Sequence, residues 1–209
     1  MDFKMQNPCH KGNRKKEYMS NINELLKKRR SIYQLNRELP VSEEEVVKLV
    51  QEATELVPDA FNMKSQRVVL ALGKKQDELW EAIDDAFGGK VPKDKIDGFK
   101  AGYGTVLYFY DEAVVKSLQE QFALYADNFP VWAQQSNGML QLSIWAGLRN
   151  LGVGANIQHY NPVINDAVRK LFNLPESYVL VAQMPFGGIV AEPAPKEKED
   201  ISLRVRVEK

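Results

Sequence analysis

The chain has 209 residues, of which 44% are hydrophobic and 27% charged, a balance typical of one globular domain and unlike that of a disordered protein. Its 28 Lys and Arg residues balance 28 Asp and Glu residues, so nothing in the charge suggests a nucleic-acid-binding or basic membrane-surface protein. The one cysteine, Cys9, excludes an intramolecular disulfide and fits a reducing compartment. The start of the chain lacks the apolar segment of a signal peptide, and residues 130–148 are too polar to span a membrane. We therefore expect a cytoplasmic protein without membrane contact.

Residues 1–19 are predicted to be a poorly ordered extension, and residues 20–209 a single domain. The extension carries a small basic cluster, for which a nucleic-acid tail and a frayed terminus are the two interpretations. Its adjacent Cys9 and His10 have no further ligand nearby, so no metal site is expected.

The rest of the chain alternates helical and strand patterns. Helices are predicted at residues 21–35, from the capping box at Ser42 to near Pro58, and at 76–87, 114–125, 130–151 and 162–172. Buried strands are predicted at residues 67–72, 105–110 and 178–183, and a half-solvated strand at 201–207. Several helices around a few strands, one of them late in the chain, favour an α+β fold without a second domain.

The helix expected at residues 130–151 has no charged residue until Arg149. A surface helix normally shows one charged face, so this helix should be covered on most sides, either in the core or at a subunit interface.

The common motifs of dinucleotide, hydrolytic and metal chemistry find no support. Gly152 and Gly154 follow a helix and Ile157 takes the third glycine position, which argues against a Rossmann fingerprint. The sequence has no Walker A motif, no zinc-ligand spacing and no Gly-x-Ser-x-Gly elbow. A Ser/His/Asp site assembled from distant residues stays open.

Four stretches carry residues suited to a bound cofactor. They are Arg29-Arg30-Ser31-Ile32-Tyr33, the segment 58–67, the segment 151–162, and Met184-Pro185-Phe186-Gly187-Gly188 with the later Arg204 and Arg206. Taken in this order, the set resembles the nitroreductase superfamily of FMN enzymes, most closely its fatty-acid-repression-mutant branch, from about residue 20 to the end. The resemblance implies a mostly antiparallel central sheet flanked by helices, in a dimer with a long buried central helix.

An FMN phosphate carries nearly two negative charges, which guanidinium groups hold best through paired hydrogen bonds. By resemblance, Arg29 with Arg204 or Arg206 would bind the phosphate, and Arg30 and Ser31 would lie along the phosphate and ribityl chain. Arg204 and Arg206 are two positions apart, so on a strand they would share one face. Exposed helix and strand faces without a ligand are the alternatives.

The flavin ring needs donors and acceptors along its uracil-like edge. Asn62 supplies both, and Lys64, Ser65 and Gln66 follow in the same loop. The family usually has Asn-Ser-Gln here, so Asn62-Met63-Lys64 is a departure that leaves the contacts of Lys64 open. As a hypothesis, the Lys64 ammonium stabilises the anionic reduced flavin. Tyr33 stands where many members have a basic residue, and would either stack near the ring or pack as a helix aromatic.

Gly152 and Gly154 allow the backbone to approach a flat ligand. Gln158 and His159 would then lie near the flavin or substrate, although a structural role is the alternative for His159. Pro185 and Phe186 precede Gly187 and Gly188, which would offer backbone N–H groups or simply turn the chain.

The resemblance implies that FMN carries the reaction, so no catalytic protein residue is expected beyond a substrate-side role for His159 or Tyr33. Electrons would pass from NAD(P)H to nitroaromatic or quinone-like acceptors by a ping-pong mechanism in a homodimer. The alternatives are another flavin reaction on this scaffold and a flavin-binding regulatory or stress-response protein with little turnover. Aromatic residues that would line the pocket or pack in the core are Phe61, Tyr103, Phe122, Tyr125, Phe129 and Trp132.

Overall fold

The computed structural model describes residues 22–209. The predicted extension, with Cys9, His10 and the basic cluster, lies outside these residues. The helices are residues 22–28, α2 (Glu43–Leu56), α3 (Lys74–Phe87), α4 (Lys93–Lys100), α5 (Glu112–Gln121), α6 (Asn128–Asn150) and α7 (Asn165–Phe172). Short 3₁₀ helices are η1 (Ala60–Asn62), η2 (Ala123–Tyr125) and η3 (Ile201–Leu203).

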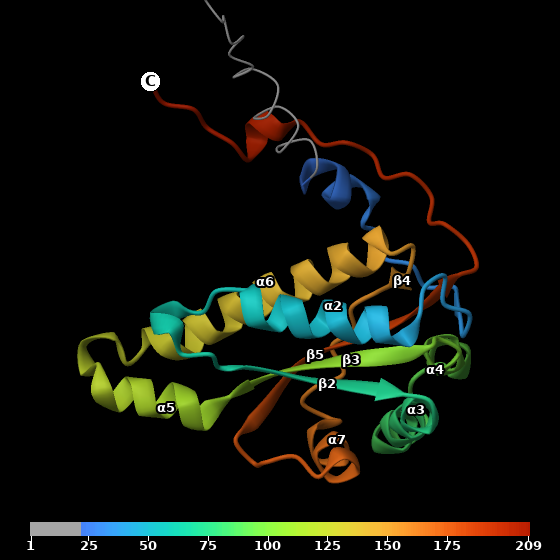
Figure 1. Cartoon of the computed structure of the whole chain (residues 1–209), viewed down its shortest axis with the longest axis horizontal. Coiled ribbons are helices and arrows are strands. Elements are labelled where there is room, and N and C mark those ends of the chain that lie inside the picture. Colours follow the sequence, from blue (N-terminus) through green and yellow to red (C-terminus); the bar gives the residue numbers. More distant parts are fainter. Residues whose placement is uncertain (1–21) are drawn as a thin grey trace, which may run out of the picture.

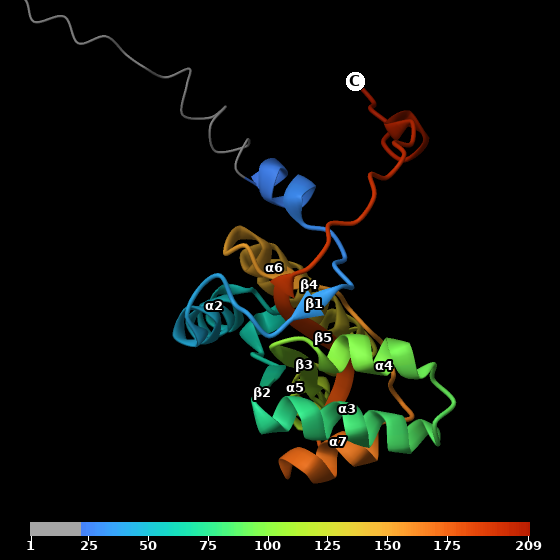
Figure 2. The ribbon, with the colours of Figure 1, turned by 90° about the vertical axis from the view of Figure 1, so that its right-hand side faces the viewer.

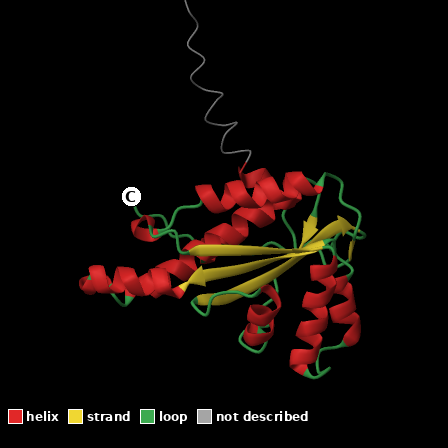
Figure 3. Ribbon diagram, turned by 60° about the horizontal axis from the view of Figure 1, so that its bottom comes forward, coloured by secondary structure: helices red, strands yellow, loops and turns green. Residues whose placement is uncertain are grey.

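One antiparallel sheet organises the chain (Figures 1 and 3). Its strands are β1 (Leu35–Asn36), β2 (Gln66–Leu72), β3 (Gly104–Asp111), β4 (Gly154–Ala155) and β5 (Tyr178–Ile189). The order is β1-β5-β3-β2, with β4 also paired to β5. The predicted α+β class with a mostly antiparallel sheet is confirmed.

Helices cover both faces of the sheet, as the end-on view shows (Figure 2). Because side chains alternate along a strand, β3 sends Val106 and Tyr108 toward α2 and α6, and Leu107 and Phe109 toward α3, α4 and α7. All four side chains are buried. The sheet is thus the middle layer between two apolar cores.

Most predicted helices are confirmed, including the capping box, in which Ser42 and Glu45 each accept from the other's backbone N–H. The helix predicted at 21–35 is wrong beyond residue 28. There the backbone turns to the sheet: Ile32 N–H donates to Ala155 at 3.0 Å, and Leu35 pairs with Ile189. Tertiary pairing therefore overrides local helix propensity in this segment.

The strand predicted at 201–207 is also wrong. The segment forms η3 and then runs without regular structure, and all its residues are exposed. A strand needs a hydrogen-bonding neighbour, and no described residue pairs with it. Figures 1 and 2 show this tail leaving the body of the molecule after β5.

The predicted strand at 178–183 is longer in the structure and runs to Ile189. Pro185, Phe186, Gly187 and Gly188 therefore lie inside β5, and of the two alternatives for the glycines the turn is wrong. Sequence reasoning also missed α4, β1 and β4. Within the described residues, no helix is both long and apolar enough to cross a bilayer.

Candidate functional site

Residues 29–33 run beside β4 at one end of the sheet. Ser31 forms a parallel bridge with Ala155, and the side-chain amide of Asn156 donates to the Ile32 carbonyl at 2.7 Å. Ile32 is buried, whereas Tyr33 is 56% exposed. The segment is thus fixed by its backbone, and Tyr33 is free to meet a ligand.

Arg29 is a cation without a counter-ion among residues 22–209. Its guanidinium carbon lies 4.1 Å from the centre of the Trp145 ring, and no described carboxylate forms an ion pair with it. Burial and the neighbouring Arg30 lower the pKa of Arg29. A partly buried arginine with free N–H groups is a suitable partner for an anion.

Two other arginines near this place are occupied. Arg30 donates to the Ala194 carbonyl at 2.8 Å. Arg149, at the end of α6, donates to the Lys28 carbonyl at 3.1 Å and to the Glu192 carboxylate at 2.6 Å. Arg149 therefore joins the segment before Arg29 to the segment that follows β5. Sequence reasoning missed it, although a lone charge at the end of a neutral helix was a usable signal.

The two glycine-containing motifs meet in the sheet. Gly154 pairs with Gly187, and Ala155 with Phe186. A Cβ on Gly187 would collide with the Asn36 carbonyl oxygen, and one on Gly188 with that of Glu38. Both glycines are thus required for close packing of the chain around β5.

Gln158 is engaged within the protein. Its backbone exchanges two hydrogen bonds with Gln183, and its side chain donates to Asn156 at 2.7 Å. His159 is exposed and has no hydrogen bond to another described residue. Of these two predicted residues, only His159 has a side chain without a hydrogen-bond partner among the described residues.

A second set of predicted residues lies in the loop before β2. Ser65 and Gln66 are buried and fix this loop: Ser65 donates twice to Asp59, and Gln66 donates to Ser136. Asn62 and Lys64 are exposed, with left-handed φ of 52° and 51°, and line a cavity of about 330 Å³. Strained backbone of this kind often occurs at functional sites.

Phe61, in the same loop, is the centre of an aromatic cluster. Its φ is 55°, and its ring lies 4.9 Å from that of Phe122 and 5.7 Å from that of Trp132, measured between centroids. Tyr125 and Phe129 complete the cluster. Five of the six predicted aromatics therefore gather beside Asn62, whereas Tyr103 lies elsewhere and donates to Glu43.

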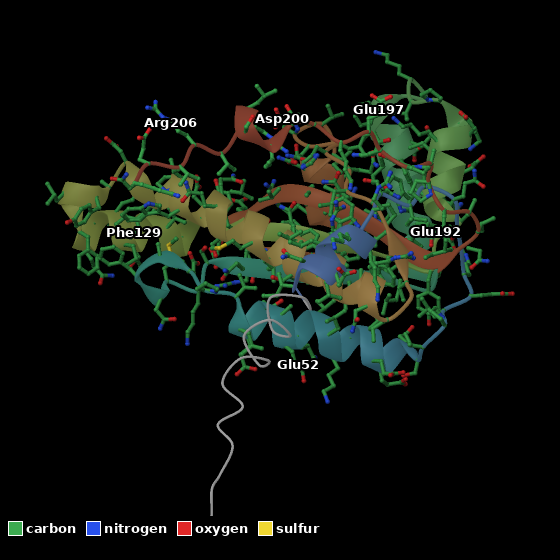
Figure 4. The ribbon with its side chains drawn as sticks, turned by 90° about the horizontal axis from the view of Figure 1, so that it is seen from above. Glu52, Phe129, Glu192, Glu197, Asp200 and Arg206 are labelled. Atoms are coloured by element: carbon green, nitrogen blue, oxygen red, sulfur yellow. The ribbon has the colours of Figure 1, made fainter. Side chains whose placement is uncertain are left out.

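The structure brings the predicted site residues together in two groups, not one. Along β3, Gly104 pairs with Phe186 of the first group, and Tyr110 pairs with Gln66 of the second. Six strand positions separate them, or roughly 20 Å. Figure 4 shows Phe129 and Glu192, which lie near the two groups, at opposite ends of the molecule.

Arg204 and Arg206 join neither group in the single chain. Both are exposed on the tail, where Arg204 pairs with Glu199 at 2.9 Å and Arg206 pairs with Glu208. Their predicted placement on one face of a strand is wrong, because no strand forms there.

Residues 26–188 match the family model described as "Nitroreductase family". The chain belongs to the nitroreductase family. It is 33% identical to "Putative nitroreductase HBN1" of Saccharomyces cerevisiae over 84% of this chain and 92% of that protein, and 32% identical to "nitroreductase FRM2" of the same yeast over 86% and 92%. These relatives confirm the predicted branch of the family.

Among solved structures, nitroreductase CinD from Lactococcus lactis in complex with chloramphenicol has 46% identity and a TM-score of 0.86, covering 90% of this chain and 100% of that one. CinD in complex with 4-nitrophenol gives 46% and 0.85, with the same coverage. The chain therefore has the family fold, and family membership implies a flavin-dependent oxidoreductase.

Proposed function

We propose that this nitroreductase holds FMN, takes electrons from NAD(P)H and passes them to nitroaromatic or quinone-like acceptors in a ping-pong cycle. The observation that carries the proposal is the Arg29 guanidinium, stacked on Trp145 with no described counter-ion. A phosphate monoester matches that charge and its free N–H donors. Family membership supports a flavin as the molecule that bears the phosphate.

The choice of substrates rests on CinD. Its structures hold chloramphenicol and 4-nitrophenol, which are nitroaromatics, and nicotinic acid, which shares the pyridine ring of nicotinamide. The aromatic cluster around Phe61 offers exposed ring faces of the kind that such rings stack on. We infer that this chain takes the same classes of ring.

A bound flavin would supply two-electron transfer between a reduced nicotinamide and the acceptor. The residues of the chain would bind and orient. Arg29 would neutralise the phosphate, Asn62 would offer its amide to the ring edge, and the Lys64 ammonium would stabilise negative charge on the reduced ring. The donor and the acceptor would use one space in turn, and no protein nucleophile is needed because the electrons would pass through the bound cofactor.

We further propose a homodimer, because the two groups of candidate residues lie about 20 Å apart in one chain. On α6, exposed residues without charge form one stripe at helical spacing: Val131, Gln135, Gly138, Met139 and Leu142. Gly138 is close to the middle of α6, and a Cβ there would meet nothing within 4 Å.

An antiparallel crossing of two α6 helices at Gly138 would place the start of one helix beside the end of the other. The Phe61 loop packs at the start of α6, and Arg29 stacks on Trp145 near its end. A two-fold dimer of this kind would therefore bring the two groups together twice. The exposed apolar side chains of the tail would gain cover from the second copy: Ile201, Leu203, Val205 and Val207. The cytoplasmic location stays a prediction.

The purified full-length protein tests this function by its colour. We expect flavin absorbance that NADH or NADPH bleaches without air and that a nitroaromatic or quinone restores. A protein that neither contains nor takes up FMN contradicts the proposal. A yellow protein that neither nicotinamide reduces indicates flavin binding without this turnover.

A further inference from the structure

The surroundings of Arg29 differ from those of an ordinary surface arginine. Its guanidinium carbon lies over the Trp145 ring, 4.1 Å from the ring centre, so the indole covers one side of the cation. The N–H edge of this guanidinium donates to no side-chain or backbone acceptor in the described part of the chain. The indole ring thus orients the cation without using its donors.

Trp145 is itself held in place. Its indole N–H donates to the Ala155 carbonyl at 3.1 Å, and the same carbonyl accepts from Ile32 N–H at 3.0 Å. One turn later on α6, Arg149 donates to the Lys28 carbonyl. Helix α6 therefore holds the ring under Arg29 and the backbone before it, and Ala155 of β4 holds the backbone after it.

The neighbouring charges make an anion the fitting ligand. Arg30 is adjacent and donates to the Ala194 carbonyl, and the nearby Glu192 carboxylate accepts from Arg149. Arg29 thus keeps its charge in a partly buried place, beside a second cation. A phosphate at its open edge would satisfy the free donors and balance the charge.

We propose that Trp145 is a positioning residue that acts through Arg29 to select the phosphorylated form of the flavin. This inference rests on the proposed FMN function. It predicts that Trp145 affects the affinity for FMN much more than that for riboflavin, which lacks the phosphate. A residue that merely supports the fold would change both affinities alike.

The test measures FMN and riboflavin binding to full-length protein stripped of flavin, as wild type, Trp145→Phe and Trp145→Met. Loss of the cation–π contact in Trp145→Met should lower the preference for FMN over riboflavin about five- to thirtyfold. Riboflavin affinity should stay within about twofold, and Trp145→Phe should keep most of the preference because it keeps an aromatic face. An equal loss of both flavins, or no loss of preference in Trp145→Met, overturns the inference.

Arg29→Met provides a second measurement that leaves the indole in place. We expect it to remove the preference for FMN, and Trp145→Met added to it should lower the preference no further, because the tryptophan acts through the arginine. Additive losses overturn the inference. Wild-type protein that binds neither flavin overturns the proposed function as well. If the wild type prefers FMN and the Trp145→Met variant keeps that preference, only the inference about Trp145 fails.

Discussion

The carboxylate of Asp59 accepts hydrogen bonds from both the backbone N–H and the hydroxyl of Ser65, at 2.8 and 2.7 Å. Between these two residues, Phe61, Asn62 and Lys64 all have left-handed backbone, which is unfavourable for residues with a side chain. Asp59 thus closes a strained loop at its base, and the exposed side chains of Asn62 and Lys64 depend on that closure.

We therefore predict that Asp59→Ala lowers the free energy of unfolding by about 1–3 kcal/mol, because Ser65 loses its acceptor in a buried place. Asp59→Asn keeps one acceptor oxygen and should lose less. Denaturant unfolding measures both variants, and FMN affinity should follow the same order. Equal stabilities of the two variants would contradict the role of Asp59 as the closure of the loop.

Lys64 should show opposite effects on stability and on activity. Its φ is 51°, so Lys64→Gly relieves backbone strain, and we expect the free energy of unfolding to stay constant or rise by up to about 1 kcal/mol. The catalytic rate should fall, since the ammonium is lost. Lys64→Arg keeps the charge and is the control, with most activity retained. A fully active Lys64→Gly variant would exclude a role for this charge.

The proposed interface on α6 predicts a change in oligomeric state. Met139→Asp and Leu142→Asp each place a charge in the neutral stripe, at positions 46% and 43% exposed in the single chain. We expect the dimer to weaken at least tenfold, because an unpaired charge is costly to bury. Light scattering after gel filtration gives the mass, and flavin content should fall with the dimer.

Val163→Asp is the matched control for that experiment. Val163 is 51% exposed and lies outside α6. It should leave both the mass and the flavin content unchanged. If both α6 variants remain dimeric, the dimer interface does not include this stripe of α6.

The tail predicts a further effect on the cofactor. Arg206 is exposed and pairs with Glu208 in the single chain, yet the family resemblance implies that Arg206 or Arg204 binds the phosphate together with Arg29. We expect Arg206→Ala to weaken FMN binding in the dimer, and Glu208→Ala to leave it unchanged or strengthen it. Fluorescence titration with FMN compares them. Full retention of FMN in both Arg29→Ala and Arg206→Ala would exclude the phosphate assignment.

The burial of Tyr108 predicts that the free energy of unfolding falls at alkaline pH. Its phenol is fully buried, and burial raises its pKa well above the usual value. The unfolded chain, with an ordinary tyrosine pKa of about 10, loses the proton first. The contribution of Tyr108 to the free energy of unfolding is therefore fully present below about pH 10 and falls as the pH rises above that value.

Urea unfolding at pH 8 to 11 checks this effect. The free energy of unfolding should decline less steeply with pH in Tyr108→Phe than in the wild type. Part of the decline should remain, because burial also raises the pKa values of Tyr110 and Tyr160. At pH 8 the change should stay below about 1 kcal/mol, because the phenol's one hydrogen bond goes to the Met184 sulfur. Parallel slopes in both proteins would contradict the prediction.

Local sequence patterns were sufficient to predict those elements whose structure depends on residues close by in the sequence. The capping box at Ser42, the neutral run of α6 and the apolar runs of β2 and β3 each predicted an element close to its observed bounds. The order of the four cofactor-type motifs was sufficient to predict the family.

Long-range pairing explains what the sequence did not predict. Residues 29–36 have helix-forming neighbours, yet their backbone groups pair with Ala155 and Ile189 far along the chain. The tail has the alternation of a strand, but none of the described residues pairs with it. Nothing in the sequence around Trp145 indicates its contact with Arg29, which is 116 positions away.

Gly187 and Gly188 are required for the packing of the chain around β5 whether or not a ligand is bound. Neither position has room for a Cβ against the carbonyl oxygens of residues 36 and 38. In a library of substitutions scored only for folded protein, with flavin left out, both positions should tolerate almost no change. Asn62 and Lys64, by contrast, should exclude mainly β-branched residues in that library, because of their left-handed backbone, yet accept few residues of any kind in one scored for turnover.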